Sequence, residues 1–191
     1  HYSSLYQLKK DCELNRNFLI LYKKFCPGPI TFVLKLKKES RISGIVTNNK
    51  TTVAVRFPKN KLTQKLLKLL KYPLAAPSAN ISTRISPVSK DDVKEEFGNK
   101  IKFILDGGRS QIRLESTIIN LVDKPKILRL AGIERIKINK ALNKNNKKTN
   151  KKITFPNQSK LHYSPGIPIK LNILKPKNNV AFILIKKRKK S

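Results

Sequence analysis

The chain has 191 residues, of which 43 are Lys or Arg and 11 are Asp or Glu, and its formal net charge is +32. Its apolar content of 39% suffices for one packed domain and a further piece, so a wholly disordered chain is excluded. The charge favours polyanionic partners such as RNA or nucleotides. The alternative is a codon bias, since 34 of the basic residues are Lys and only 9 are Arg.

Several classes of protein are disfavoured. The longest apolar runs, such as AFILI, are too short to span a bilayer, so no membrane association is expected. Cys12 and Cys26 lack the spacing of a zinc site, and His1 and His162 lie at opposite ends of the chain. Unpaired cysteines predict a reducing, cytoplasmic setting.

The first elements in chain order are a helix, two strands and a second helix. A helical pattern over about 3–25 ends at CPGP, whose prolines and glycine cannot continue it. Apolar and β-branched residues predict strands at 30–36 and 51–57. The segment 61–71, KLTQKLLKLLK, has the spacing of an amphipathic helix.

The pattern then continues with a helix at 89–98 and strands at 102–106, 116–122 and 126–130. Ser89 is the expected N-cap of that helix and Gly98 its stop, with acidic residues in its first turns. Alternating helices and strands predict an α/β fold, a twisted open mixed sheet with flanking helices.

The amino-acid composition of the chain changes after residue 136. The segment 137–175 has many Lys and Asn residues and reads as a basic linker, and 176–191 begins like the first strand of a second α/β domain. The last 57 residues carry 17 basic residues and no acid. Because the chain lacks an initiator Met and starts abruptly, we expect it to be an internal piece of a longer protein.

A series of motifs occurs in a fixed order. It comprises CPGPITFVLK (26–35), TTVAVRFP (51–58), PLAAPSANIS (73–82), SP (86–87), ILDGG (104–108), LESTIINL (114–121), ILRLAGI (127–133) and LHYSP (161–165). The series resembles the threonylcarbamoyl-AMP synthase family, whose domain is called YrdC-like, in its longer two-domain version. Residues 1–136 would be the catalytic domain, and HYSP would lie in the linker.

The resemblance implies an enzyme that joins L-threonine, bicarbonate and ATP into threonylcarbamoyl-AMP and releases pyrophosphate. A downstream threonylcarbamoyltransferase would pass the product to the tRNA adenosine next to the anticodon. The chemistry needs two anions to be positioned and their repulsion screened. Mg²⁺ is the expected cofactor, arriving with ATP. No side chain is expected to act as an acid or base, and no protein metal site is expected.

Residue roles follow from the resemblance. It implies L-threonine binding by Arg56, Ala76, Ser116 and His1. For ATP it implies Thr52, Ser78, Asn80, Ser86, Arg129 and Tyr163.

Physical reasoning supports part of this set. Arg56 follows an apolar strand, at the kind of strand end where α/β sheets bind ligands, and its guanidinium suits a carboxylate. Small residues in PLAAPSAN permit close approach of a ligand to the backbone, with Ser78 and Asn80 as short donors. The alternative for Arg56 is a solvated arginine at the end of a strand. The alternative for PLAAPSAN is a proline-bounded strand followed by a turn.

The chain departs from the family in three places. Arg113 and Leu114 stand where Gly usually precedes EST, and Leu130 stands where Pro is common. The family's lysine and arginine pair, in a KxR arrangement, and a threonine-containing loop would both lie upstream of the point where this sequence starts, so we expect the 191 residues alone to be weakly active or inactive.

Two other functions stay open. One is a double-stranded RNA-binding module without catalysis, which the charge would support. The other is the YrdC-like domain of a hydrogenase-maturation carbamoyltransferase.

Overall fold

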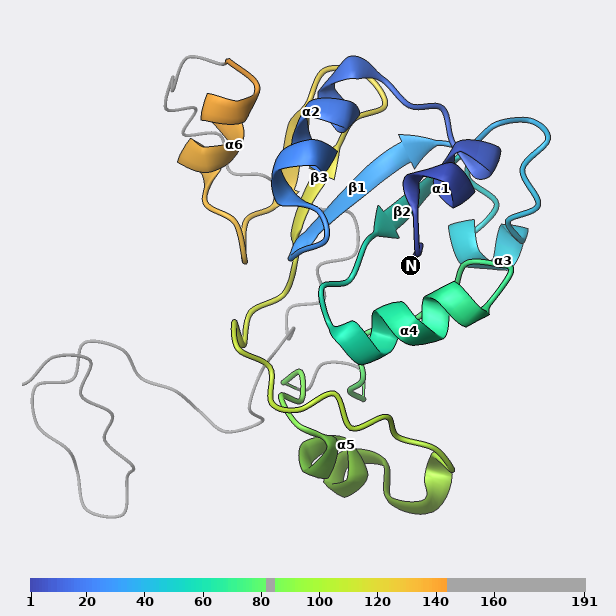
Figure 1. Cartoon of the computed structure of the whole chain (residues 1–191), viewed down its shortest axis with the longest axis vertical. Helices are drawn as coiled ribbons and strands as arrows, with labels where there is room; N and C mark the ends of the chain where they lie inside the picture. The colour runs from blue at the N-terminus through green and yellow to red at the C-terminus, as the bar shows by residue number, and fades with distance from the viewer. Residues whose placement is uncertain (82–84, 144–191) are drawn as a thin grey trace, which may run out of the picture.

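A computed structural model describes residues 1–81 and 85–143 of the chain. Its centre is a four-stranded mixed sheet in the order β2-β1-β3-β4 (Figure 1). The strands are β1 (Ile30–Lys35), β2 (Thr52–Arg56), β3 (Thr117–Asn120) and β4 (Lys126–Arg129). β1 runs parallel to β3, whereas the β1–β2 and β3–β4 pairs are antiparallel. The predicted α/β fold with a mixed sheet is therefore confirmed.

One face of the sheet is buried beneath the first two helices, α1 (Leu5–Asp11) and α2 (Arg16–Phe25). Alternate residues of β1 point into this core, with Ile30 and Phe32 fully buried and Thr31 only half-buried. The ring of Phe18 on α2 meets that of Phe32 edge to face, with centroids 5.0 Å apart. The alternation leaves the opposite face of the sheet partly open.

The remaining helices are short. They are α3 (Gly44–Thr47), α4 (Lys61–Leu69), α5 (Lys90–Phe97), the 3₁₀ turn η1 (Gly98–Lys100) and α6 (Arg135–Ala141). α5 lies below α4, away from the sheet (Figure 1). Ser89 caps α5 in a reciprocal capping box with Asp92, and Gly98 ends the helix with φ +52°. Both cap predictions are confirmed.

The single helix predicted over 3–25 is wrong, because two helices flank a break. The backbone nitrogen of Glu13 donates to Lys35 O at 2.9 Å, and Cys12 forms an isolated antiparallel β-bridge with Leu36. Asn15 then starts α2 by accepting a hydrogen bond from the Phe18 nitrogen. Pairing with the sheet thus replaces helical hydrogen bonds at the break.

The strand predicted at 102–106 is also wrong. Phe103 is 89% exposed and Leu105 58% exposed, and no described strand pairs with this segment. Alternating apolar residues suit a strand only where a neighbouring strand and a core receive them. Here the segment runs as loop beside α5.

One described helix crosses the boundary that was predicted at residue 136. α6 crosses that boundary, and its Ile138 is 1% exposed because it joins the core beside α2. The remainder of the predicted linker from 144, the HYSP segment and the proposed second domain lie outside the described residues.

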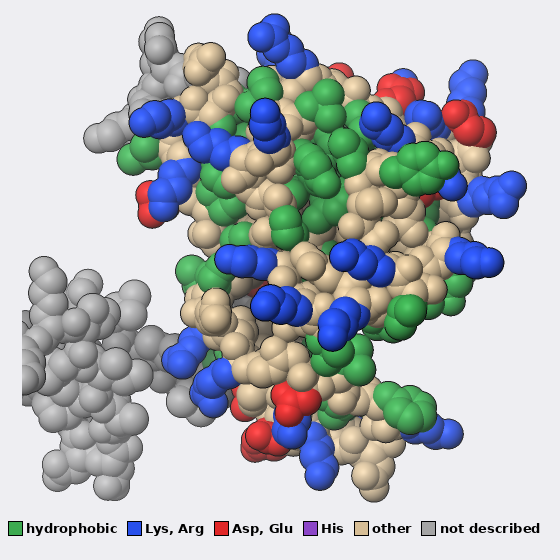
Figure 2. Space-filling view, viewed as in Figure 1, with side chains coloured by type: hydrophobic (Ala, Val, Ile, Leu, Met, Phe, Trp, Pro, Cys, Tyr) green, Lys and Arg blue, Asp and Glu red, His purple; other side chains and the backbone are tan. Residues whose placement is uncertain are grey.

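Basic side chains are spread over the whole face seen in Figure 2, with few acidic ones among them. On that face the basic side chains do not gather into one continuous patch. Within 1–81 and 85–143, no helix has the length and apolar character needed to cross a bilayer.

Candidate functional site

The ends of all four strands meet at one edge of the sheet. Arg56 ends β2 and lies opposite Thr31 near the start of β1. Thr31 in turn lies beside Ile118 of β3, which faces Arg129 at the end of β4. Paired residues of neighbouring strands share a face, so the two arginines and the threonine hydroxyl share the open one.

A cavity of about 870 Å³ opens on this face. Its lining combines the strand ends with the loop before β3, the loop and helix at 41–46, the N-terminal residues and the small-residue segment 72–78. The volume lies within the usual range for small-molecule sites.

Backbone hydrogen bonds join the small-residue segment to the sheet through the N-terminal residues. The backbone nitrogen of His1 donates to Leu74 O at 2.7 Å, and the Leu74 nitrogen donates to His1 O at 3.1 Å. The next residue, Tyr2, donates from its backbone nitrogen to Arg56 O at 3.0 Å. The end of β2, the N-terminal residues and PLAAPS are thereby held together.

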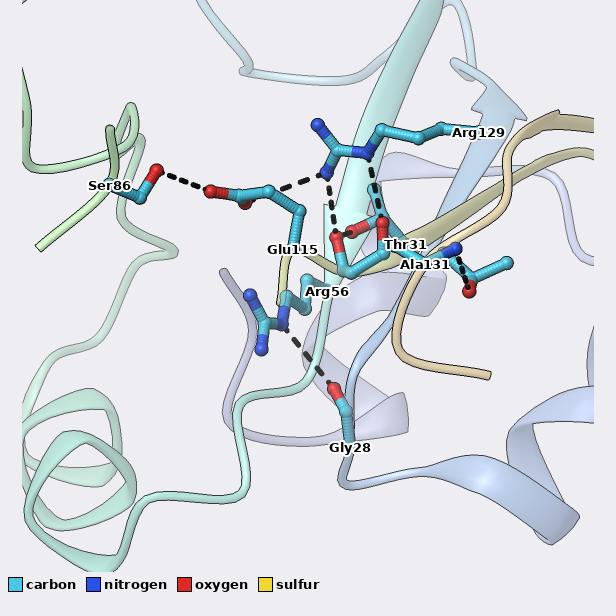
Figure 3. A network of polar contacts seen from close by, with 9 residues as sticks. Gly28, Thr31, Arg56, Ser86, Glu115, Arg129 and Ala131 are labelled. Carbon is cyan, nitrogen blue, oxygen red and sulfur yellow. Dashed lines mark hydrogen bonds and ion pairs between the residues drawn. The ribbon is translucent and has the colours of Figure 1, made fainter. Parts of the chain in front are cut away.

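Ser116 is the centre of the polar contacts at the sheet edge. Its hydroxyl lies 2.7 Å from Thr31 Oγ1 and accepts a hydrogen bond from Arg129 Nη2 at 3.3 Å. Arg129 Nε also donates to Ser116 O at 3.0 Å (Figure 3). The guanidinium of Arg129 is therefore fixed against the start of β3.

Thr117, fully buried behind this site, holds the loop that follows β4. Its hydroxyl donates to Ile133 O at 3.0 Å and accepts from the backbone nitrogens of Ala131 and Ile133 at 3.1 and 2.9 Å. Gly132 lies in this loop, and a Cβ there would come within 2.8 Å of Pro29 Cβ. A side chain at 132 would push the loop away from the sheet edge.

Glu115 connects the sheet edge to the segment at 85–88. Its Oε1 accepts a hydrogen bond from Ser86 Oγ at 2.5 Å, and its Oε2 lies 3.7 Å from Arg129 Nη2 (Figure 3). Ser86 therefore touches the site through a carboxylate that lines the cavity.

Arg56 is oriented by a single backbone contact. Its Nε donates to Gly28 O at 3.3 Å, and no other hydrogen bond joins its guanidinium to the residues described. Burial lowers the pKa of Arg56, the Glu115 carboxylate raises it and the Arg129 charge lowers it. The group still remains protonated at neutral pH. Its terminal nitrogens are thus available to an anion.

The structure brings together six residues that the sequence predicted for the site. His1, Arg56, Ala76, Ser78, Ser116 and Arg129 all line the cavity. Ser86 adjoins it through Glu115. Thr52 and Asn80 are outside the lining, and the Asn80 amide donates to Ile81 O instead. Tyr163 lies outside the described residues.

Sequence reasoning missed Thr31 and Glu115. Thr31 is the polar residue of a strand whose alternate positions are apolar, and Glu115 opens the quoted EST motif. A polar side chain on the open face of an otherwise apolar strand was the available signal for Thr31.

The departures from the family pattern have a structural counterpart. Arg113 adopts φ +53°, in the left-handed region that favours glycine, so the backbone keeps the turn that a glycine would make easily. Leu130 follows β4 and is 51% exposed, and Arg129 before it keeps its hydrogen bond to Ser116 O.

The cavity suits anions better than a resident metal ion. Within the described ranges, no three His, Cys, Asp or Glu side chains are grouped to hold a cation. The acids of the lining are Asp11 and Glu115, against three arginines, Arg41, Arg56 and Arg129. Guanidinium groups beside hydroxyls bind carboxylates and phosphates.

Known proteins resemble the chain over this region. Residues 1–131 match the Sua5/YciO/YrdC family, described as "Telomere recombination". A protein of Pyrococcus abyssi named threonylcarbamoyl-AMP synthase is 41% identical over 69% of this chain and 38% of its own length. A protein of the same name from Schizosaccharomyces pombe is 44% identical over 61% and 29%.

A solved structure agrees with these matches. The crystal structure of P. abyssi Sua5 complexed with L-threonine superposes with a TM-score of 0.70 at 40% identity, covering 74% of this chain and 42% of that one. The chain thus spans less than half the length of these relatives. With the family match extending over most of its residues, the chain belongs to the Sua5/YciO/YrdC family.

Proposed function

We propose that the protein is a nucleotidyltransferase that forms threonylcarbamoyl-AMP and pyrophosphate from L-threonine, bicarbonate and ATP, for the modification of tRNA. The observation that carries this proposal is the cavity that Arg56, Ser116 and Arg129 line together with the small-residue segment 73–78. The names of the relatives support the same reaction.

Arg56 is assigned to the threonine carboxylate. Its terminal nitrogens can form two parallel hydrogen bonds to the two carboxylate oxygens. The hydroxyl of Ser116 is 2.7 Å from that of Thr31, on the same face, and supplies a polar contact to the amino acid. Ala76 and His1 complete this end of the cavity, where the backbone approaches closely.

Arg129 and Ser78 are assigned to the nucleotide phosphates, with Ser86 beside them. The amine of threonine and bicarbonate first condense to a carbamate with loss of one water molecule. The carbamate oxygen then attacks the α-phosphorus of ATP, and the bond from that phosphorus to the bridging oxygen breaks, releasing pyrophosphate. The residues of this chain hold the two anions in contact and offset their charges. No proton transfer to a side chain is assigned. Thr52, Asn80 and Tyr163 are further candidates for nucleotide contacts.

Mg²⁺ is proposed to enter on the phosphates of ATP. Magnesium sites of this type use substrate phosphates, water and one or two carboxylates, so the sparse acids of the lining fit this route. The ion would neutralise the departing pyrophosphate.

We further propose that the protein works in the cytoplasm and supplies a tRNA-modifying threonylcarbamoyltransferase. Both cysteines in the described residues are free, which suits a reducing compartment. RNA binding by the basic surface and tail stays a separate prediction, to be measured as salt-dependent affinity for a duplex RNA.

The test is pyrophosphate release from ATP by the protein as encoded in its genome. We expect release that requires both L-threonine and bicarbonate. Release that persists without threonine would refute the assignment. Activity with carbamoyl phosphate replacing threonine and bicarbonate would favour the carbamoyltransferase alternative.

A further inference from the structure

Glu115 is the lining acid that forms an ion pair with an arginine of the cavity. It lies 3.7 Å from Arg129 Nη2, and its charge also acts on Arg56, whose protonated form it favours. Figure 3 shows its carboxylate between Ser86 and Arg129, with Arg56 close by. One carboxylate therefore serves as counter-ion to two guanidinium groups.

The two guanidinium groups need such a counter-ion when no ligand is bound. The charge of Arg129 disfavours the protonated form of Arg56, which indicates that the two cations act on each other across the site. Arg129 is 31% exposed and Glu115 27% exposed. Water therefore screens only in part the charges at Arg129, both its repulsion of Arg56 and its attraction to Glu115.

Arg129 does not depend on Glu115 for its position. Its Nε and Nη2 donate to the backbone oxygen and the hydroxyl of Ser116 at 3.0 and 3.3 Å. The contact with Glu115 is longer than a hydrogen bond and is an ion pair by charge alone. Loss of the Glu115 charge would therefore leave the guanidinium in place and make the cavity more positive.

We propose that Glu115 is an internal counter-ion that competes with the anionic ligand for Arg129 and so sets the affinity of the cavity for phosphate. An incoming phosphate takes over the ion pair with Arg129. Glu115 then retains its hydrogen bond from Ser86, which keeps the displaced carboxylate at the cavity wall. The inference rests on the proposed function in one respect, namely that the natural anions are the phosphates of ATP.

The test compares the wild-type chain with Glu115→Gln, which has nearly the same shape and can still accept the hydrogen bond from Ser86. Glu13→Gln is the matched control, because Glu13 forms an exposed ion pair with Lys35, 3.1 Å away and outside the cavity lining. Both variants change the net charge equally. Binding of inorganic pyrophosphate is measured by titration calorimetry without Mg²⁺.

We expect Glu115→Gln to bind pyrophosphate roughly fivefold or more tightly than wild type, in line with the loss of one competing partly buried ion pair. Glu13→Gln should stay within about twofold. The empty Glu115→Gln protein should melt at a lower temperature than wild type, and pyrophosphate should raise that temperature further than it does for wild type.

Equal or weaker pyrophosphate binding by Glu115→Gln would overturn the proposal, and so would equal tightening in both variants. These results are independent of pyrophosphate release from ATP. If Glu115→Gln binds pyrophosphate more tightly but the protein shows no threonine-dependent release of pyrophosphate, the counter-ion role of Glu115 stands and the proposed reaction is refuted.

Discussion

Replacing Arg56 by Lys tests the assignment of the amino-acid end of the cavity. Lys keeps the positive charge but loses the planar fork of the guanidinium. In the structure the Nε of Arg56 is already bonded to Gly28 O, at 3.3 Å, which leaves the terminal nitrogens to meet a carboxylate. An ammonium group at this position would form one good hydrogen bond where the guanidinium forms two.

The expected loss is one charge-assisted hydrogen bond. Such a bond contributes about 1.5–3 kcal/mol, which corresponds to threonine binding that is about 10- to 150-fold weaker. The bond from Nε to Gly28 disappears as well, so the true effect should lie toward the upper part of this range.

The assay is calorimetric titration of L-threonine at saturating ATP. Arg16→Lys is the matched control, because Arg16 is exposed at the start of α2, on the covered side of the sheet. Threonine affinity of Arg56→Lys within about twofold of wild type would refute the carboxylate assignment.

Three further predictions concern stability and reactivity. Thr117→Val should lower the free energy of unfolding in urea by about 2–4 kcal/mol, because it leaves three backbone groups unpaired. Thr117→Ser keeps the hydroxyl and should lower it by about 1 kcal/mol. Equal losses in the two variants would contradict the role of the hydroxyl. Arg113→Gly should raise the free energy of unfolding in urea by up to about 1 kcal/mol because φ of Arg113 is +53°, while Arg109→Gly should not raise it. A decrease for Arg113→Gly would count against the left-handed turn. Burial raises the pKa of Cys12 and Cys26 to about 12, so both thiols should resist iodoacetamide at pH 8 until urea unfolds the chain. The stability from these thiols is complete below their unfolded pKa near 8.5 and should be lost as pH rises toward 12; rapid native alkylation, or flat stability above pH 9, would refute this.

Local rules predicted the strands of the sheet and the ends of α5. Alternation of apolar and polar residues in β1 correctly separates the core side, with Ile30 and Phe32, from the side that carries Thr31. The N-cap at Ser89 and the stop at Gly98 follow from side-chain and backbone chemistry that needs no tertiary contact.

Tertiary pairing decided the elements that sequence reasoning missed. The helix break at Cys12 exists because the backbone there pairs with the end of β1, and Phe103 stays exposed because no described strand accepts its segment. Ile138 looked like part of a basic linker, but α2 provides a surface for it. Propensity cannot show which neighbour a segment meets.

The candidate site was predictable where its residues belong to quoted motifs. Arg56, Ser116 and Arg129 come together because register aligns the ends of the four strands at one edge. The link between Glu115 and Ser86 joins positions 29 residues apart, through a loop whose path no local rule specifies. For that reason the carboxylate was found only in the structure.

The central claim is that one cavity joins threonine, bicarbonate and ATP, and isotope labelling tests it most directly. The protein as encoded would be incubated with ATP, L-threonine and ¹³C-bicarbonate, and the nucleotides would be analysed by mass spectrometry. Our account predicts an adenylate that contains threonine and the ¹³C label, formed together with pyrophosphate. Hydrolysis of ATP with no labelled adenylate would contradict it.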